Sequence, residues 1–217
     1  MPSILLVTND FGPRAGGIET FVIGLLERIP RGEVVVYTST QEDSASFDQR
    51  WRDEFGVEVI RDRASILLPT PRVIKNLQRE IRSRNLTKVW FGAAAPLGFS
   101  ARWLRKSGAQ HIVALTHGHE VWWSKIWPFS WAMKEIARSV DIATYLGDFT
   151  RRALEPRFTD SRKLIKVAPG IDTDHFKPHD SIELRRSLQL HDRPTIISVG
   201  RLVHRKGQDR LVEAMPA

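Results

Sequence analysis

The sequence predicts an α/β fold in which helices cover both faces of a doubly wound parallel sheet of the Rossmann type. The main observation is an alternation along the 217 residues, in which short runs rich in valine and isoleucine are separated by helix-length stretches with one apolar face. A second observation is that turns rich in glycine or histidine follow several of these runs. Open α/β sheets bind their ligands at such turns.

The predicted elements follow one another as a parallel sheet requires, because parallel strands need helical crossovers between them. The strands are expected at residues 4–8, 33–38, 88–91, 111–116, 141–145, 164–168 and 195–200. The helices are expected at residues 18–29, 71–84, 96–106, 128–140, 149–157 and 181–190, with one more after residue 200.

A change in composition near residue 179 predicts a division of the chain. Proline and polar residues cluster on either side of a charged helix there, and the apolar periodicity weakens. We expect a first domain at residues 1–178, a connector at 179–194, and the first strand and helix of a second, incomplete Rossmann-like domain at 195–217. One strand and one helix cannot bury their apolar faces alone, so this end should be poorly packed unless more chain covers it.

Composition narrows the possible functions. The chain has no cysteine, which excludes disulfides and thiolate metal sites. Its net charge of +8 favours acidic partners such as phosphates, nucleic acid or anionic lipid headgroups. No run approaches the roughly 18 apolar residues of a membrane span, and the first residues resemble a buried strand more than a signal peptide. A cytoplasmic or membrane-peripheral protein is therefore expected.

The turn after the first predicted strand, residues 9–19, is a candidate anion site. It enters a helix at Gly16 and Gly17, where backbone N–H groups and the helix dipole favour a negative charge. It is not a P-loop, because Ile18 and Glu19 stand where lysine and serine or threonine are required. It also lacks the glycine spacing of a dinucleotide site. Taken alone, the turn has a tight connection without a ligand as its alternative.

A second candidate site follows the strand expected at 111–116. His117 and His119 lie two residues apart and Glu120 comes next. A metal site is not favoured, because no third strong ligand is near in the sequence. A histidine that orients a substrate or stabilises a developing charge fits better, since imidazole can form hydrogen bonds with hydroxyl groups at neutral pH.

Two more motifs come later in the chain. Pro169 and Gly170 form a turn after a strand, and alone they are structural. Arg201 and Lys206 lie five residues apart around a loop that opens a helix. Two cations near a helix N-terminus suit a diphosphate, although a basic loop alone is more often simply solvated.

In this order the four motifs resemble those of the retaining GT-B glycosyltransferases of family 4. The residues that carry the resemblance are Gly16-Gly17, His117-Gly118-His119-Glu120, Pro169-Gly170-Ile171-Asp172 with Phe176, and Gly200-Arg201 with Arg205-Lys206-Gly207. The resemblance covers the whole chain. It implies two facing Rossmann-like domains, with the acceptor mainly on the first and the nucleotide-sugar mainly on the second. The acidic motif of the second domain is absent, which implies that residues 1–217 alone are inactive.

Within the family, residues 5–11, 89–97 and 116–121 resemble those of the actinobacterial mannosyltransferases that extend phosphatidylinositol mannosides. This resemblance implies GDP-mannose as the donor and a phosphoinositide glycolipid as the acceptor, in the synthesis of cell-envelope glycolipids. It also implies that the enzyme acts at an anionic membrane surface, on the inner face of the plasma membrane.

The resemblance further implies a role for each motif. His117 would bind the transferred sugar and stabilise an oxocarbenium-like transition state. Arg201 and Lys206 would neutralise the donor diphosphate, and Gly16 and Gly17 would offer N–H groups to the same phosphates. Because a donor phosphate oxygen is thought to assist deprotonation of the acceptor, no protein nucleophile, metal or cofactor is expected. The acceptor-side candidates are Asn9, Asp10, His119 and Glu120.

A lipid acceptor leads to separate predictions about the surface. The helix expected at 71–84 carries four cations largely away from its apolar face, namely Arg72, Lys75, Arg79 and Arg82. Trp122 and Trp123 are expected in a loop, where indoles suit a membrane interface. Trp127 and Trp131 have helical spacing and are expected in the core. A half-buried helix with a solvated face is the alternative for residues 71–84.

Three alternatives stay open from the sequence. A family 4 enzyme could use another nucleotide-sugar or a soluble acceptor. The charge would also permit a nucleic-acid-binding module, but no helix-turn-helix or RNA-recognition motif is apparent, so no nucleic-acid partner is expected. An NAD-dependent oxidoreductase is disfavoured by the missing glycine fingerprint and by the lack of a ribose-binding acid after the second strand.

Overall fold

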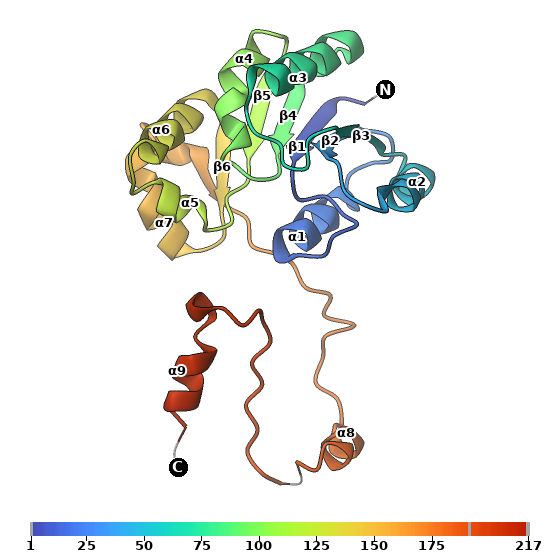
Figure 1. The fold of residues 1–217 in the computed structure, drawn as a ribbon, viewed down its shortest axis with the longest axis vertical. Helices are drawn as coiled ribbons and strands as arrows, with labels where there is room; N and C mark the ends of the chain where they lie inside the picture. Colours follow the sequence, from blue (N-terminus) through green and yellow to red (C-terminus); the bar gives the residue numbers. More distant parts are fainter. Residues whose placement is uncertain (1, 191, 216–217) are drawn as a thin grey trace. The chain divides into compact units, whose positions relative to one another are not determined.

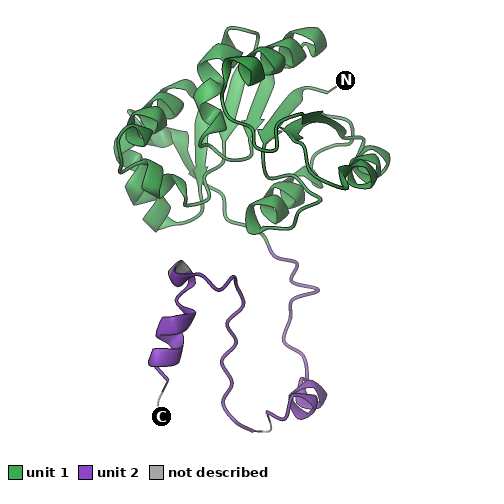
Figure 2. Ribbon diagram, viewed as in Figure 1, with its two compact units in different colours: residues 1–170 green, residues 171–217 purple. Residues whose placement is uncertain are grey.

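The computed structural model describes residues 2–190 and 192–215, and it divides the chain into two compact units (Figure 2). The first comprises Met1–Gly170 and the second Ile171–Ala217. The domain bounds expected from the sequence, with a connector at 179–194, stay a prediction. His191 of that connector and residues 216–217 of the last segment lie outside the described residues.

Among the described residues, seven strands form one parallel sheet in the order β3-β2-β1-β4-β5-β6-β7 (Figure 1). The strands are β1 Ile4–Thr8, β2 Val34–Ser39, β3 Glu58–Asp62, β4 Lys88–Phe91, β5 His111–Ala114, β6 Ile142–Tyr145 and β7 Leu164–Lys166. Strand order reverses between β1 and β4, so the chain has a topological switch point there. The predicted Rossmann-like, doubly wound sheet is confirmed.

Helices connect the strands and end at residues that suit helix termini. The α-helices of the first unit are α1 Gly17–Leu26, α2 Ser44–Phe55, α3 Pro71–Arg84, α4 Ala101–Arg105, α5 Glu120–Trp123, α6 Phe129–Ser139 and α7 Asp148–Leu154, and its short 3-10 helices are η1 Leu97–Ser100, η2 Glu155–Arg157 and η3 Ser161–Lys163. Helix α3 illustrates the local cause. Thr70 accepts a hydrogen bond from the Val73 N–H, Pro71 occupies the first turn, and Asn85 ends the helix in the left-handed region.

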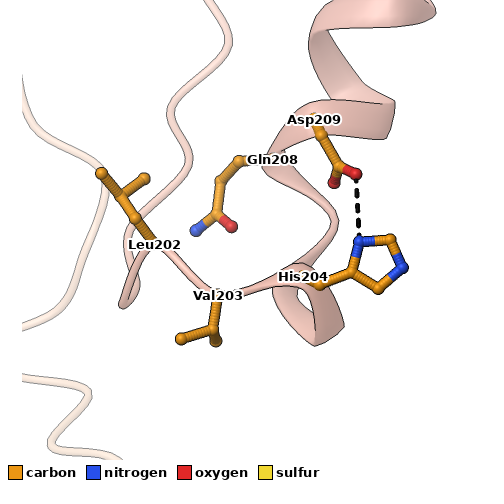
Figure 3. Close-up of a pocket in the computed structure, with 5 residues that line it drawn as sticks. All are labelled: Leu202, Val203, His204, Gln208 and Asp209. Carbon is orange, nitrogen blue, oxygen red and sulfur yellow. Dashed lines mark ion pairs between the residues drawn. The ribbon is translucent and has the colours of Figure 1, made fainter.

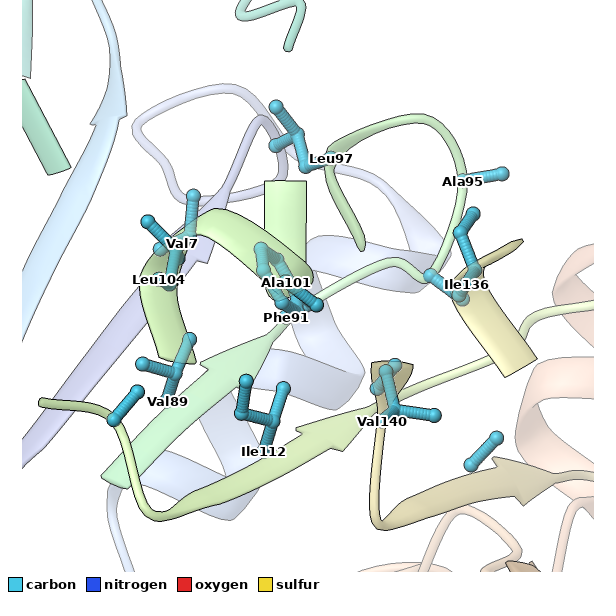
Figure 4. Packing of buried hydrophobic residues seen from close by; sticks show 14 of the residues in the cluster. Val7, Val89, Phe91, Ala95, Leu97, Ala101, Leu104, Ile112, Ile136 and Val140 are labelled. Atoms are coloured by element: carbon cyan, nitrogen blue, oxygen red, sulfur yellow. The ribbon is translucent and has the colours of Figure 1, made fainter. Parts of the chain in front are cut away.

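Two hydrophobic layers fix the sheet between the helices. Because strand side chains alternate, Leu5 and Val7 of β1 pack with α3, α4 and α6, whereas Leu6 packs with α1 and α2 on the other face. Figure 4 shows part of the first layer, in which Phe91 and Ile112 contribute from β4 and β5. Burial on both faces explains why the strand sequences are continuous apolar runs.

The second unit differs from the sequence prediction. It contains α8 Ile182–Ser187, η4 His204–Lys206 and α9 Gln208–Glu213. The strand expected at 195–200 is wrong for this structure, because these residues adopt no strand. Ile197 is 81% exposed and Val199 is 92% exposed. A strand needs a hydrogen-bonded neighbour, and no described segment of this unit pairs with the run.

The described residues include no helix that combines the length and the apolar character needed to span a membrane.

Candidate active site

The carboxyl ends of β1, β4 and β5 bring together, at the switch point, the two predicted turns after β1 and β5 and the turn after β4. The Ala94 N–H donates to the Leu115 carbonyl oxygen at 2.6 Å, which ties the turn after β4 to the end of β5. The Gly92 N–H donates to the Val7 carbonyl oxygen at 3.0 Å, which ties the same turn to β1. Residues far apart in the sequence therefore form one edge, as the sequence predicted.

His117 is half-buried at this edge with its ring held in one orientation. Its Nε2 lies 2.6 Å from the Gly92 carbonyl oxygen. Because a carbonyl only accepts, Nε2 carries the proton of this hydrogen bond, and Nδ1 is the ring nitrogen left for a ligand. Phe21 of α1 packs edge-on against the imidazole at 5.7 Å between ring centres. A histidine held in this way can form a hydrogen bond with a substrate hydroxyl at small entropic cost.

Gly92, whose carbonyl oxygen holds the His117 ring, lies where no side chain fits. A Cβ atom at Gly92 would lie 2.5 Å from Oγ1 of the buried Thr8, which is too close for any other residue. Gly92 and Phe21 were not predicted as site residues. A glycine directly after a buried strand is the signal that could have identified Gly92, whereas the position of Phe21 depends on how α1 crosses the sheet.

Glu120 is completely buried inside the histidine turn. Its Oε2 accepts hydrogen bonds from the N–H groups of His117 at 3.0 Å and Gly118 at 3.1 Å. Its Oε1 lies 3.3 Å from Nε2 of His119. Gly118 has φ of +96°, a conformation that favours glycine. The carboxylate thus shapes the turn that carries both histidines, and direct contact between Glu120 and an acceptor is not expected.

The N-terminus of α1 faces the predicted anion site without a side-chain cap from any described residue. Its N-cap residue is Gly16, and a Cβ atom there would lie 2.2 Å from Oε2 of Glu19. The buried Glu19 pairs with Arg14 at 2.8 Å. Among the described residues no side chain caps these N–H groups, although the carboxylate of Glu19, balanced by Arg14, lies beside Gly16. Donor binding by the two glycines stays a prediction.

Asp10 is an electrostatically strained carboxyl group in the same cluster. Burial raises its pKa, and the charge of Glu19 raises it further. His117, Arg14 and His119 oppose this shift. A carboxyl group whose pKa is perturbed by burial and by several charged neighbours at the ligand edge of a sheet is typical of a functional site.

Asn9 is another acceptor-side candidate, and both polar atoms of its side-chain amide form hydrogen bonds within the fold. Its Nδ2 donates to the Leu67 carbonyl oxygen at 3.0 Å, and its Oδ1 accepts from the Leu67 N–H at 2.7 Å. These bonds anchor the segment between β3 and α3 to the sheet edge. Contact between Asn9 and an acceptor stays a prediction, and holding Leu67 is the function that the structure supports.

Arg201 and Lys206 belong to the second unit. Both are exposed, and the Arg201 carbonyl oxygen accepts from Nε2 of Gln208 at 3.2 Å, which closes the loop between them. A shallow hollow of about 280 Å³ lies beside this loop (Figure 3), where His204 and Asp209 form an ion pair at 3.3 Å. A shared site with His117 stays a prediction, because that residue belongs to the first unit.

The four predicted surface cations of α3 are not equivalent. Lys75, Arg79 and Arg82 are exposed. Arg72 instead binds the buried carboxylate of Asp62 through two hydrogen bonds of 2.7 and 2.9 Å. This guanidinium holds the pKa of Asp62 well below its usual range. Arg72 therefore attaches α3 to the sheet, and its charge is already balanced within the fold.

The neighbouring tryptophans differ from their predicted positions. Trp122 and Trp123 lie in helix α5 and not in a loop, and Trp123 is half-buried against the core. Trp127 is 80% exposed and Trp131 is 50% exposed, so their predicted core packing is wrong. The buried face of α6 is set by Met133, and Trp131 precedes it by two residues, about 200° around the helix.

A metal site would need several ligand side chains close together. Within the part of the chain that the structure describes, no three histidine, cysteine, aspartate or glutamate side chains lie close enough to hold an ion. Transfer without a metal or cofactor stays a prediction.

Comparisons with protein families and with curated proteins both match this chain to glycosyltransferases. The family model described as Glycosyltransferase Family 4 matches residues 15–175. The GDP-mannose-dependent alpha-(1-6)-phosphatidylinositol monomannoside mannosyltransferase of Mycobacterium tuberculosis is 38% identical, over 100% of this chain and 57% of its own length. The corresponding enzyme of Corynebacterium glutamicum, named for a monoacylated acceptor, is 37% identical over 98% of this chain and 56% of its own. The chain thus spans somewhat more than half the length of these relatives.

Solved structures show a similar fold at low sequence identity. Anabaena HepE in complex with UDP and glucose matches with a TM-score of 0.72 and 13% identity, over 99% of this chain and 57% of that one. A glycosyltransferase from Rickettsia africae matches with a TM-score of 0.61 and 16% identity, over 98% of this chain and 56% of that one. At these identities the likeness concerns the fold alone.

Proposed function

Because this chain belongs to glycosyltransferase family 4, we propose that it is the acceptor-side part of a retaining enzyme that transfers mannose from GDP-mannose to a phosphatidylinositol mannoside. One observation supports the proposal most strongly. Relatives that are 37–38% identical over nearly the whole chain are named for this donor and this class of acceptor. The expected role is in the synthesis of phospholipid-linked glycolipids of the cell envelope.

In the proposed reaction, the bond between the mannose C1 and the donor phosphate breaks, and its electron pair leaves with GDP. A hydroxyl oxygen of the acceptor forms the new bond to C1 on the same face of the sugar, and its proton passes to a donor phosphate oxygen. Arg201 and Lys206 would balance the charge that develops on the leaving diphosphate. His117, oriented by Gly92, would bind a mannose hydroxyl and stabilise the positive charge near C1.

The acceptor would lie against the edge formed by the turns after β1 and β5. Asp10 is the carboxylate that we assign to accept hydrogen bonds from sugar or inositol hydroxyls, because it is partly buried beside the charge of Glu19 and its ion pair with Arg14 is long, at 3.8 Å. His119, whose ring is partly exposed beside the same cluster, is the second candidate. Neither role needs a metal.

The proposed acceptor is a lipid, so the enzyme is expected to act at a membrane surface. Lys75, Arg79 and Arg82 are exposed on α3 and line a hollow of about 510 Å³ on its outer side. Each such cation contributes about 1 kcal/mol near an anionic leaflet. We therefore place the protein at the periphery of the membrane, on the inner face of the plasma membrane. No nucleic-acid partner is proposed.

The test uses the protein at its natural length with GDP-mannose, UDP-glucose and UDP-N-acetylglucosamine, and with detergent-solubilised phosphatidylinositol mannoside as acceptor. Transfer from GDP-mannose alone is expected. The His117→Ala variant should lose roughly 100- to 1000-fold in kcat. His111→Ala is the matched control, since His111 lies exposed at the opposite end of the same strand. Transfer only from a UDP-sugar, or no transfer to the lipid, would refute the proposal.

A further inference from the structure

The segment of residues 122–131, which we call the aromatic segment, exposes more apolar surface than its sequence predicts. It runs from the end of α5 into α6, which lie with α7 at one end of the first unit (Figure 1). Trp127 is 80% exposed, Trp122 53%, Trp131 50% and Ile126 41%. Scattered apolar residues on a surface are ordinary, but several large ones within ten positions suggest a binding surface.

The aromatic segment is held in a defined shape. Phe129 contacts Trp122 at 5.0 Å and Trp123 at 4.7 Å between ring centres, and Trp123 packs against the hydrophobic core. The guanidinium of Arg157 also donates to the Ser124 carbonyl oxygen. The exposed indoles are therefore presented from an anchored base, and binding through them costs less conformational entropy than binding through a loose loop.

The charge around the aromatic segment favours an anionic partner. Residues 121–134 contain no aspartate or glutamate, and they contain two lysines, Lys125 and Lys134, both exposed. The ring of Trp131 lies 5.5 Å from that of Phe99. In the adjoining helix α4, the guanidinium of Arg102 lies 3.8 Å over a ring of Trp103. Apolar rings framed by cations are typical of surfaces that enter the headgroup region of a bilayer.

The aromatic segment is also close to the candidate site along the chain. Helix α5 begins at Glu120, directly after the turn that carries His117 and His119. A surface bound through Trp122 would thus lie next to the edge where the acceptor is proposed to bind. A lipid acceptor could then reach this edge while its acyl chains stay in the bilayer.

We propose that the aromatic segment inserts its indole rings into the interface of an anionic lipid bilayer and so provides an apolar anchor separate from the cations of α3. For its biological meaning this inference rests on the proposed lipid acceptor. The two contributions respond differently to salt. Attraction by Lys75, Arg79 and Arg82 is screened as ionic strength rises, whereas burial of the indoles is not.

Flotation with vesicles of phosphatidylcholine and phosphatidylglycerol tests the inference, using the protein at its natural length at low and high salt. The Trp122→Ser and Trp127→Ser double variant should bind at least tenfold more weakly at both salt concentrations. A variant with glutamine at positions 75, 79 and 82 should bind more weakly at low salt only. Ile165→Ser is the control, because Ile165 is 43% exposed on β7, outside the aromatic segment.

Two results would overturn the inference. One is unchanged binding of the double variant, and the other is complete release of the unaltered protein at high salt, which would make the attachment purely electrostatic. Concentration-dependent self-association that the double variant abolishes, without any effect on vesicle binding, would also overturn it by assigning the surface to a second copy of the chain. Brominated lipids give a direct reading, since they should quench the fluorescence of the unaltered protein more than that of the variant.

Transfer assays separate this inference from the proposed function. The double variant should use detergent-solubilised acceptor at the normal rate and vesicle-embedded acceptor at a reduced rate. An equal loss with both forms of acceptor would contradict the inference and indicate damage to the site. If the unaltered protein transfers no mannose, the proposed function fails, while vesicle binding still decides the inference. Equal melting temperatures of variant and unaltered protein show that both are folded.

Discussion

The two units of the chain contain similar apolar runs, but these runs are paired and buried only in the first unit. In the first unit, Leu6 and Val36 lie in paired strands and are fully buried between helices. In the second unit, Ile197 and Val199 belong to a run of the same composition, and both are almost fully exposed. The difference shows that a strand is a property of pairs of segments. An apolar run provides the side chains, but the hydrogen bonds and the covering helices must come from elsewhere in the chain.

The largest expected effect tests this difference directly by amide hydrogen exchange in the 217-residue chain. The amides of Leu6 and Val36 should exchange only through global opening, with protection on the order of 10⁴-fold or more. The amides of Ile197 and Val199 should exchange at nearly the rate of an unfolded peptide. Comparable protection in both units would show that the second unit pairs its run after all, and the contrast between the units would be wrong.

A second test compares the contributions of the two units to transfer. In the protein at its natural length, Arg201→Ala and Lys206→Ala should each lower kcat/KM roughly 100- to 1000-fold, because the leaving diphosphate would lose a balancing charge. Arg210→Ala is the matched control. It also lies exposed in the second unit, where it pairs with Glu213 at the surface.

The melting temperature of the first unit should not change in either variant, since neither residue belongs to it. Transfer at nearly normal rates would refute the proposed roles of Arg201 and Lys206.

Much of the fold of the first unit could be predicted, because the sequence patterns that define its helices and strands lie within short stretches of chain. The bounds of β1 and α3 agree with the apolar pattern, and α3 also has its proline start and its terminal asparagine. Helix α2 and strand β3 were not predicted. Helix α2 buries only Trp51, and β3 contains two apolar and three charged residues without a long apolar run. Their positions depend on how the chain covers one edge of the sheet. That arrangement cannot be predicted from a short stretch of sequence.

The candidate site likewise has parts that the sequence could predict and parts that it could not. The histidine turn and the glycine turn were predicted because parallel strands place their carboxyl ends at one edge. The burial of Glu120, the use of Asn9 by Leu67 and the pairing of Arg72 with Asp62 could not be predicted. Asn9 meets Leu67 across 58 positions of the chain, Arg72 meets Asp62 across 10, and Glu120 is buried by the closing of its own turn. Residue type showed which groups are polar, and only the packing shows which of them stay available to a ligand.

The smallest expected effect concerns Asp10, where stability and activity should change in opposite directions. Burial and Glu19 raise the pKa of Asp10 in the folded chain, so the folded state binds this proton more tightly than the unfolded state does. The stabilising contribution is then present below the unfolded pKa of about 3.9 and is lost as pH rises through the raised folded pKa. At neutral pH the ionised carboxylate therefore costs stability. Asp10→Asn should have a higher Tm than the unaltered protein at pH 7, and the difference should shrink below pH 4.

The same substitution should lower kcat/KM for the lipid acceptor roughly 10- to 100-fold, because hydrogen bonds from the acceptor to a charged group would be lost. Asp43→Asn is the control, since Asp43 is exposed at the start of α2 and caps nothing through its side chain. Its Tm should match that of the unaltered protein at both pH values. If Asp10→Asn were no more stable than the unaltered protein at pH 7, Asp10 would be an ordinary surface carboxylate. If it gained stability without losing activity, the strained carboxylate would have no role in binding the acceptor.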